Sequence, residues 1–213
     1  MTKQAFHDDM PENRSTEDRN PPVRLLLILL TGAVMVLVVW GLKLSGVIPT
    51  APPNNQAVGT PLQELALQPL IGGGSDLELA DLNEHVTLVN FWGTWCPPCM
   101  IEFPHLVEMA KRLEGHHEFQ FISIATGPRL ELEADGALLH NTEGFIKEKG
   151  YDVRVFADTG GVTRRSLLEQ IGGASFQYPT TVLLDRQGNI RGVWVGYREG
   201  LVGEIEKAVK RLL

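Results

Sequence analysis

Apolar residues along the chain occur in two kinds of pattern, which predict different elements. Residues Val86–Trp92 and Phe119–Ala125 are nearly continuous apolar stretches, which is typical of strands buried on both faces of a sheet. Residues Pro97–Leu113 carry apolar side chains at roughly helical spacing and are followed by Gly115, so they predict a helix. Shorter patterns predict the strands Leu77–Leu79, Val153–Ala157, Thr180–Leu184 and Ile190–Val195, and the helices Thr142–Lys149, Val162–Ile171 and Leu201–Leu213.

The order of these elements predicts the fold class. From Val86 onward it is β-α-β-α-β-α-β-β-α, which indicates an α/β domain with a mixed central sheet and helices on both faces. Active sites in such sheets lie where the strand order switches direction. The chain has 213 residues, so we expect one domain, residues 59–213, together with extra segments.

The first 58 residues follow neither pattern and predict a membrane anchor with a tether. Residues 1–24 are polar and are expected to form a cytoplasmic tail. Residues 25–42 contain no charged side chain, and at 1.5 Å per residue a helix over this run is about 27 Å long, close to the thickness of the hydrocarbon core. Residues 43–58 are rich in proline and asparagine in their second half and predict an extended linker.

The distribution of basic residues predicts the orientation of this transmembrane helix. Lys3, Arg14, Arg19 and Arg24 precede the apolar run, whereas only Lys43 lies directly after it. The positive-inside rule then predicts a single-pass protein of the inner (cytoplasmic) membrane, with a cytoplasmic N-terminus and a periplasmic domain. A cleaved signal peptide is the alternative, but the apolar run is unusually long for one and no clear cleavage site follows it, so we favour an uncleaved anchor.

Composition narrows the classes of function. The net charge is −7 and no basic block is present, which excludes a nucleic-acid partner. The chain contains only 2 cysteines, so it is not a disulfide-rich scaffold, and a single C-x-x-C pair near a βαβ pattern indicates redox chemistry.

These two cysteines lie at a predicted strand-to-helix junction, in the order Cys96-Pro97-Pro98-Cys99. A thiolate at a helix N-terminus is favoured by the macrodipole and by unpaired N–H groups, so Cys96 is predicted to be the nucleophile and Cys99 the resolving thiol. The prolines suit the first helical positions and predict that both thiols lie at a surface rather than in the core. The alternative is half of a zinc site, but a closed site needs about four ligands and no second cysteine pair exists.

The segment Leu88–Pro104, LVNFWGTWCPPCMIEFP, resembles the active-site segment of thioredoxin-fold oxidoreductases, in particular the membrane-anchored TlpA/ResA-like branch. The residues on both sides of the W-C-P-P-C core match as well, and the resemblance extends over about residues 59–213. It implies a thioredoxin-like fold with a short N-terminal hairpin and a helical insert at about residues 127–150. It also implies that the active group is a redox-active Cys96–Cys99 disulfide, with no bound cofactor and no metal.

The resemblance further implies which residues surround the disulfide. Tyr178-Pro179 precedes a predicted strand, as the cis proline of thioredoxin-like folds does. We therefore expect a cis Tyr178–Pro179 bond, contact between Pro179 and Cys96, and substrate binding along the adjoining backbone. Trp95 is expected to cover the disulfide and to contact the substrate, together with Pro97 and Pro98.

Glu102 is the candidate acid or base. It lies three residues after Cys99 on the same side of the helix, and the resemblance implies a partly buried carboxyl near the thiols, with a raised pKa, that takes the Cys99 proton. The alternative is an exposed acid stabilised by the helix dipole. Asn90 stands where plain thioredoxins carry a buried aspartate, so proton transfer is expected to fall to Glu102.

The resemblance implies a membrane-tethered reductase of particular protein disulfides, such as those of apocytochrome c or of copper-site proteins. A membrane electron donor of the DsbD/CcdA type would recharge it, because a dithiol in an oxidising compartment needs such a supply. Two alternatives stay open: a disulfide oxidant or isomerase, and a thiol module that carries Cu(I), which soft thiolates select.

Overall fold

The computed structural model describes residues 29, 31–32, 55–128 and 136–213, which fall into two separate units. The first unit, Met1–Thr50, contributes only Leu29, Thr31 and Gly32, which are helical. None of the helices in the described ranges is both long and apolar enough to span a bilayer. The expected tail, the rest of the expected anchor and the linker up to residue 54 lie outside the described residues.

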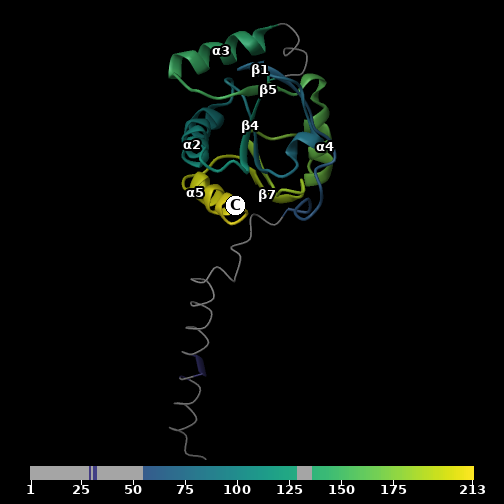
Figure 1. The fold of residues 1–213 in the computed structure, drawn as a ribbon, viewed down its shortest axis with the longest axis vertical. Helices are drawn as coiled ribbons and strands as arrows, with labels where there is room; N and C mark the ends of the chain where they lie inside the picture. Colours follow the sequence, from purple (N-terminus) through teal and green to yellow (C-terminus); the bar gives the residue numbers. More distant parts are fainter. Residues whose placement is uncertain (1–28, 30, 33–54, 129–135) are drawn as a thin grey trace, which may run out of the picture. The chain divides into compact units, whose positions relative to one another are not determined.

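The second unit, Ala51–Leu213, is built on a mixed sheet of seven strands (Figure 1). The strand order is β2-β1-β5-β4-β3-β6-β7, with β3, β4 and β5 parallel and the other pairs antiparallel. The strands are β1 (Ala66–Ile71), β2 (Leu77–Glu78), β3 (Val86–Trp92), β4 (Phe119–Ala125), β5 (Val155–Ala157), β6 (Thr180–Leu184) and β7 (Ile190–Val195).

Helices cover both faces of this sheet (Figure 1). Helices α2 (Pro97–Leu113) and α5 (Leu201–Lys210) pack on one face, and α4 (Val162–Ile171) packs on the other. Helix α3 (Ala137–Lys149) shares a third core cluster with the start of α2, and this cluster includes both cysteines. Two short 3-10 turns, Leu79–Leu82 and Thr159–Gly161, complete the described elements.

Burial explains why β3 lies near the centre. All seven of its residues are buried, and it pairs with β4 on one side and with β6 on the other. A strand with both faces covered gains from a continuous apolar sequence, because each side chain then leaves water. The strand therefore provides a rigid base from which the chain enters the cysteine motif.

The predicted α/β fold with a mixed sheet and helices on both faces is confirmed, and most bounds agree. The main difference is α3, which begins at Ala137 rather than Thr142. The first turns belong to the helix because Leu138, Thr142 and Ile146 are buried along one side of it, at a spacing of four residues. Smaller differences are that β5 begins at Val155 and that α5 ends at Lys210, after which the chain turns.

Among the described residues, those from Asn55 onward pack against the domain, although the domain was expected to start at residue 59. Ala57 is buried, and the Asn55 side-chain amide donates to the carbonyl of Ile171 at the end of α4 (3.2 Å). Backbone bonds then join Gly59 and Thr60 to Ile190 of β7, each at 2.8 Å. The last part of the predicted linker is therefore attached to the domain.

Candidate active site

The cysteine motif takes its shape from the junction between β3 and α2. Cys96 is the N-cap of α2 with an extended backbone, and Pro97 and Pro98 occupy the first helical positions. Cys96 and Cys99 form a disulfide, with their Cα atoms 5.2 Å apart. The Cys96 sulfur also accepts a hydrogen bond from the Cys99 backbone N–H (3.3 Å), so it lies among the unpaired donors of the helix start.

The two cysteines are less exposed than the sequence predicted. Cys96 retains 3% of its accessible surface and Cys99 none, so both residues are buried and the prediction of a surface position is wrong. The reason is the apolar cluster around them, in which Trp92 stacks on Phe103 with ring centroids 3.8 Å apart. Of the two, only Cys96 retains any accessible surface, which agrees with the predicted order of attack. Pro97 and Pro98, which precede the buried thiol, are exposed.

Trp95 lies directly before the disulfide and is held in one orientation. Its indole N–H donates to the Thr126 carbonyl (2.7 Å), while 40% of its surface stays exposed. Gly93 allows this contact, because a Cβ at that position would lie 2.6 Å from the Thr126 oxygen and would also collide with the indole nitrogen. Trp95 is thus fixed at one end and open to a partner at the other.

The Tyr178–Pro179 peptide bond is cis, as predicted. Pro179 is buried, and contact between its ring and Cys96 stays a prediction. Tyr178 is half-buried and packs against the cluster that contains both cysteines. Its ring meets Trp95 edge-on, with centroids 5.2 Å apart, and lies 5.3 Å from the ring of Phe176.

Glu102 is buried rather than exposed, which excludes the interpretation as a surface acid. It retains 1% of its accessible surface, and its Oε1 atom accepts hydrogen bonds from Asn90 Nδ2 (3.1 Å) and Thr181 Oγ1 (3.0 Å). Burial raises the pKa of Glu102 from 4.5 to about 7, although the hydrogen bonds from Thr181 and Asn90 lower it. The predicted rise in pKa is confirmed, and the carboxyl lies one helical turn beyond Cys99.

Asn90 and Thr181 form the support of this carboxyl. They are direct partners in the antiparallel register of β3 and β6, and Asn90 Nδ2 also donates to Thr181 Oγ1 (2.9 Å). The Asn90 Oδ1 atom is buried and has no hydrogen-bond partner among the described residues. Asn90 therefore acts as a hydrogen-bond donor to Glu102.

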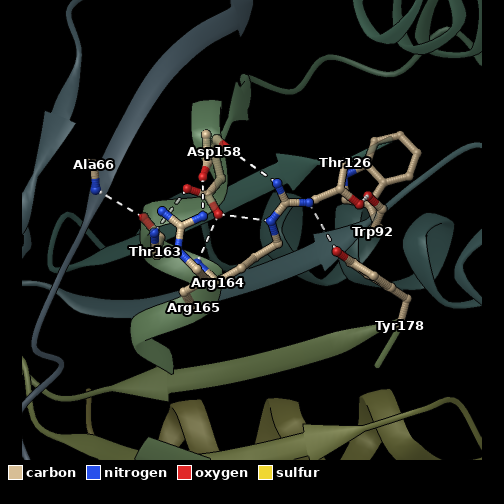
Figure 2. Close-up of polar contacts among 9 residues, drawn as sticks. Ala66, Trp92, Thr126, Asp158, Thr163, Arg164, Arg165 and Tyr178 are labelled. Carbon is tan, nitrogen blue, oxygen red and sulfur yellow. Dashed lines mark hydrogen bonds and ion pairs between the residues drawn. The ribbon is translucent and has the colours of Figure 1, made fainter. Parts of the chain in front are cut away.

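A second buried acid, Asp158, directly follows β5, and its network extends to Tyr178 (Figure 2). Asp158 is fully buried and pairs with Arg164 through Oδ2 and Nε, 3.0 Å apart. The same guanidinium donates from Nη1 to the Tyr178 hydroxyl (3.1 Å). A charged pair therefore contacts the residue that precedes Pro179.

Four residues that shape this site were not predicted from the sequence: Thr126, Asp158, Arg164 and Thr181. Asp158 had a usable signal, because an aspartate between a predicted strand and helix is a common capping residue. Arg164 and Thr126 had none, since their roles depend on contacts between distant parts of the chain.

The described residues provide no evidence for a metal centre. No group of three or more histidine, cysteine or acidic side chains in the described ranges is close enough together to hold an ion. The chemistry available at the site is that of the disulfide and the buried carboxyl.

Comparison with known proteins gives one family. The Redoxin family model matches residues 57–211. ResA, a thiol-disulfide oxidoreductase of Bacillus subtilis, is 31% identical over 123 residues, a match that spans 58% of this chain and 60% of that protein. ResA of Halalkalibacterium halodurans is 28% identical over 158 residues, or 74% of this chain and 77% of that protein.

A solved structure agrees with these matches. The thiol:disulfide interchange protein of Chlorobium tepidum has a TM-score of 0.57 and 28% identity, and the match covers 72% of this chain and 95% of that one. The predicted resemblance to thioredoxin-fold oxidoreductases is therefore confirmed.

The buried carboxyl predicts a specific dependence of stability on pH. A raised pKa means that the folded state favours protonated Glu102, so this stabilisation is complete below about pH 4.5 and is lost as the pH rises through about 7. The oxidised Glu102→Gln variant keeps the side-chain oxygen that accepts from Asn90 and Thr181, and removes the charge. We expect the unfolding free energy of the wild type to fall relative to this variant, by up to about 3 kcal/mol, over that interval.

Urea unfolding at a series of pH values measures this difference. Glu108→Gln is the matched control, because it removes an exposed carboxyl from the same helix and should follow the wild type. Parallel pH profiles for wild type and Glu102→Gln would show that the carboxyl is not held away from water.

Proposed function

The chain belongs to the Redoxin family and is a thiol–disulfide oxidoreductase, and from this premise we propose that it is a membrane-tethered reductase of specific protein disulfides. The observation that carries the proposal is the disulfide itself. Of its two cysteines only Cys96 retains any accessible surface, and Cys96 is the N-cap of a helix. A pair of this kind can attack a partner in two ordered steps.

In the reduced protein the Cys96 thiolate attacks one sulfur of the substrate disulfide. A mixed disulfide forms, and the other substrate sulfur leaves as a thiolate. The Cys99 thiolate then attacks the Cys96 sulfur, which forms the Cys96–Cys99 disulfide and releases the second substrate thiolate. Two electrons pass from the pair to the substrate, whose thiolates take up two protons.

The surroundings of the pair support this sequence. The helix start and the Cys99 N–H stabilise negative charge on the Cys96 sulfur. Trp95, Pro97 and Pro98 provide an exposed rim that a polypeptide could contact, and the backbone around Pro179 would bind it in an extended form. No bound cofactor enters this scheme, because the sulfurs themselves carry the electrons.

We also propose that Glu102 accepts the proton of Cys99 before the second step. A carboxyl whose pKa is about 7 can take up and release a proton near neutral pH. Its negative charge would also disfavour a thiolate at Cys96, because neighbouring sites titrate together.

Replacement of Glu102 by Gln tests this role in the reduced protein. We expect the pKa of the Cys96 thiol to fall, because the competing negative charge is gone. The alkylation rate of Cys96 as a function of pH measures the change, with Glu108→Gln as control. An alkylation profile identical to that of the wild type would reduce Glu102 to a structural residue.

The substrate and the direction of electron flow are parts of the proposal. The family resemblance favours reduction of disulfides such as those of apocytochrome c or copper-site proteins. Reduction in an oxidising compartment requires a membrane dithiol donor, for which a DsbD/CcdA-type protein has the right chemistry. An oxidant or isomerase is the alternative, and the reduction potential of the pair separates these functions.

Trapping tests the reductase function directly. Reduced Cys99→Ala protein should accumulate mixed disulfides with its substrates, because the resolving thiol is absent, whereas Cys96→Ala should accumulate none. The potential of the wild-type pair, measured against glutathione, should lie nearer to thioredoxin at about −270 mV than to DsbA at about −120 mV. A potential near that of DsbA would favour the oxidant instead.

We further propose that residues 25–42 anchor the protein in the cytoplasmic membrane, with the catalytic domain on the periplasmic side. The support is the long charge-free run and the basic residues before it. Carbonate extraction should leave full-length protein in the membrane pellet. A mature soluble form that begins after Ile48 would contradict the anchor.

A further inference from the structure

We propose that Arg164 is a positioning residue, which holds the Tyr178 ring beside Trp95 so that a polypeptide disulfide binds productively at Cys96. The proposal rests on the proposed reductase function and adds a residue outside the cysteine motif. It concerns substrate binding rather than the transfer of electrons, because Arg164 bonds the hydroxyl of Tyr178 and not a cysteine sulfur.

Arg164 is itself held in place by hydrogen bonds to Asp158. Asp158 Oδ2 accepts from both the backbone N–H (2.9 Å) and the Nε of Arg164 (3.0 Å), and the Asp158 carbonyl accepts from Nη2 (3.3 Å). The arginine side chain is 8% exposed and that of Asp158 is fully buried. A buried guanidinium always carries its charge, so it stays with this carboxylate.

Asp158 is held in turn by the start of α4. Its Oδ1 atom accepts from the backbone N–H of Thr163 (3.0 Å), so one carboxylate bonds two consecutive N–H groups of the helix. The Thr163 hydroxyl accepts from the N–H of Ala66 in β1 (3.0 Å), which joins the helix start to the sheet (Figure 2). The position of the guanidinium is therefore set by the start of α4 and by the sheet, rather than by a loop.

Tyr178 connects the Arg164 guanidinium to the surroundings of the disulfide. Its hydroxyl accepts from Arg164 Nη1 (3.1 Å), and its ring edge meets Trp95, whose indole is bonded to Thr126. The ring thus lies between two groups that are each held by hydrogen bonds. Tyr178 also packs on the cluster that contains the two cysteines and precedes Pro179 in the chain.

Packing alone leaves the Tyr178 ring room to move. An open hollow of about 200 Å³ adjoins it, and its lining includes Gly127, Gly161, Leu168 and Phe176 as well as Tyr178. The ring is half-buried, and without the bond to Arg164 it could turn into this hollow and leave Trp95. The charged hydrogen bond therefore selects one position of the ring.

The consequence differs between substrates. A polypeptide that lies along Trp95 and the backbone before Pro179 needs the ring in place. A small disulfide that reaches only the Cys96 sulfur does not. Loss of the Arg164–Tyr178 hydrogen bond should therefore raise KM for a peptide disulfide. It should change neither the rate with a small disulfide nor the reduction potential of the cysteine pair.

Tyr178→Phe tests the proposal with the smallest change, since it removes only the hydroxyl. The probes are a synthetic peptide closed by a Cys-x-x-Cys disulfide, with several residues on either side, and bis(2-hydroxyethyl) disulfide. We expect KM for the peptide to rise about five- to tenfold at similar kcat, which corresponds to the typical net contribution of one hydrogen bond. The rate with the small disulfide should stay within about twofold of the wild type.

Arg164→Gln supplies the other half of a double-mutant cycle. It should raise KM for the peptide by a similar factor, and the double variant should be no worse than either single one, because the same bond is removed twice. Should Arg164→Gln fail to fold with Asp158 left unpaired, Tyr178→Phe still decides the question. Tyr151→Phe, which removes a phenol hydroxyl outside the loop before Pro179, should behave as wild type.

The outcomes separate the two proposals. If the reduced wild type does not reduce the peptide, the reductase function fails. If the wild type reduces it and Tyr178→Phe has the same KM, only the positioning role is overturned. Equal losses with both probes, or effects that multiply in the double variant, would likewise overturn the role of the Arg164–Tyr178 bond.

Discussion

The antiparallel register that sets Asn90 opposite Thr181 is the constraint on which the site depends. It brings an amide and a hydroxyl together on the face of the sheet that α2 covers, where both reach the carboxyl of Glu102. A slip of one residue would turn either side chain to the other face and leave the carboxyl buried without donors. The last pair of the same register, Phe91 with Thr180, also brings the end of β3 to the start of β6, where Pro179 lies.

The domain keeps two buried acids by opposite means. Asp158 faces a guanidinium, which is permanently charged, so the pair is a fixed part of the structure. Glu102 faces neutral donors, and burial makes its protonated form stable up to about neutral pH. The first arrangement suits a group that holds others in place, and the second suits a group that exchanges a proton. Glu102 belongs to α2, which follows β3, and Asp158 directly follows β5.

Local patterns in the sequence were sufficient for most of the fold. The strands Val86–Trp92 and Phe119–Ala125 and the helix Pro97–Leu113 were predicted with the bounds observed, because their apolar spacing is set by burial within one element. The cysteine pair, the cis bond and the raised pKa of Glu102 followed from the resemblance to a known family. Long-range contacts were missed, such as Thr181 to Glu102 and Arg164 to Tyr178, because a hydroxyl or a guanidinium in the sequence carries no sign of its partner. The burial of Cys99 was missed for a similar reason, since the side chains around it come from several elements.

The attachment of Asn55–Thr60 has a mechanical consequence. These residues are bonded to the end of α4 and to β7 at the edge of the sheet, so the chain enters the domain through contacts that stand apart from the first strand, β1. A force that pulls on the chain before Asn55 acts first on those hydrogen bonds and on the packing of the buried Ala57 side chain. The force reaches β1 only after these contacts break. Strand β3 and helix α2, which position the cysteines, lie further along the chain. Tension in the N-terminal segment is thus absorbed at an edge of the fold, and the geometry around the sulfurs is shielded from it.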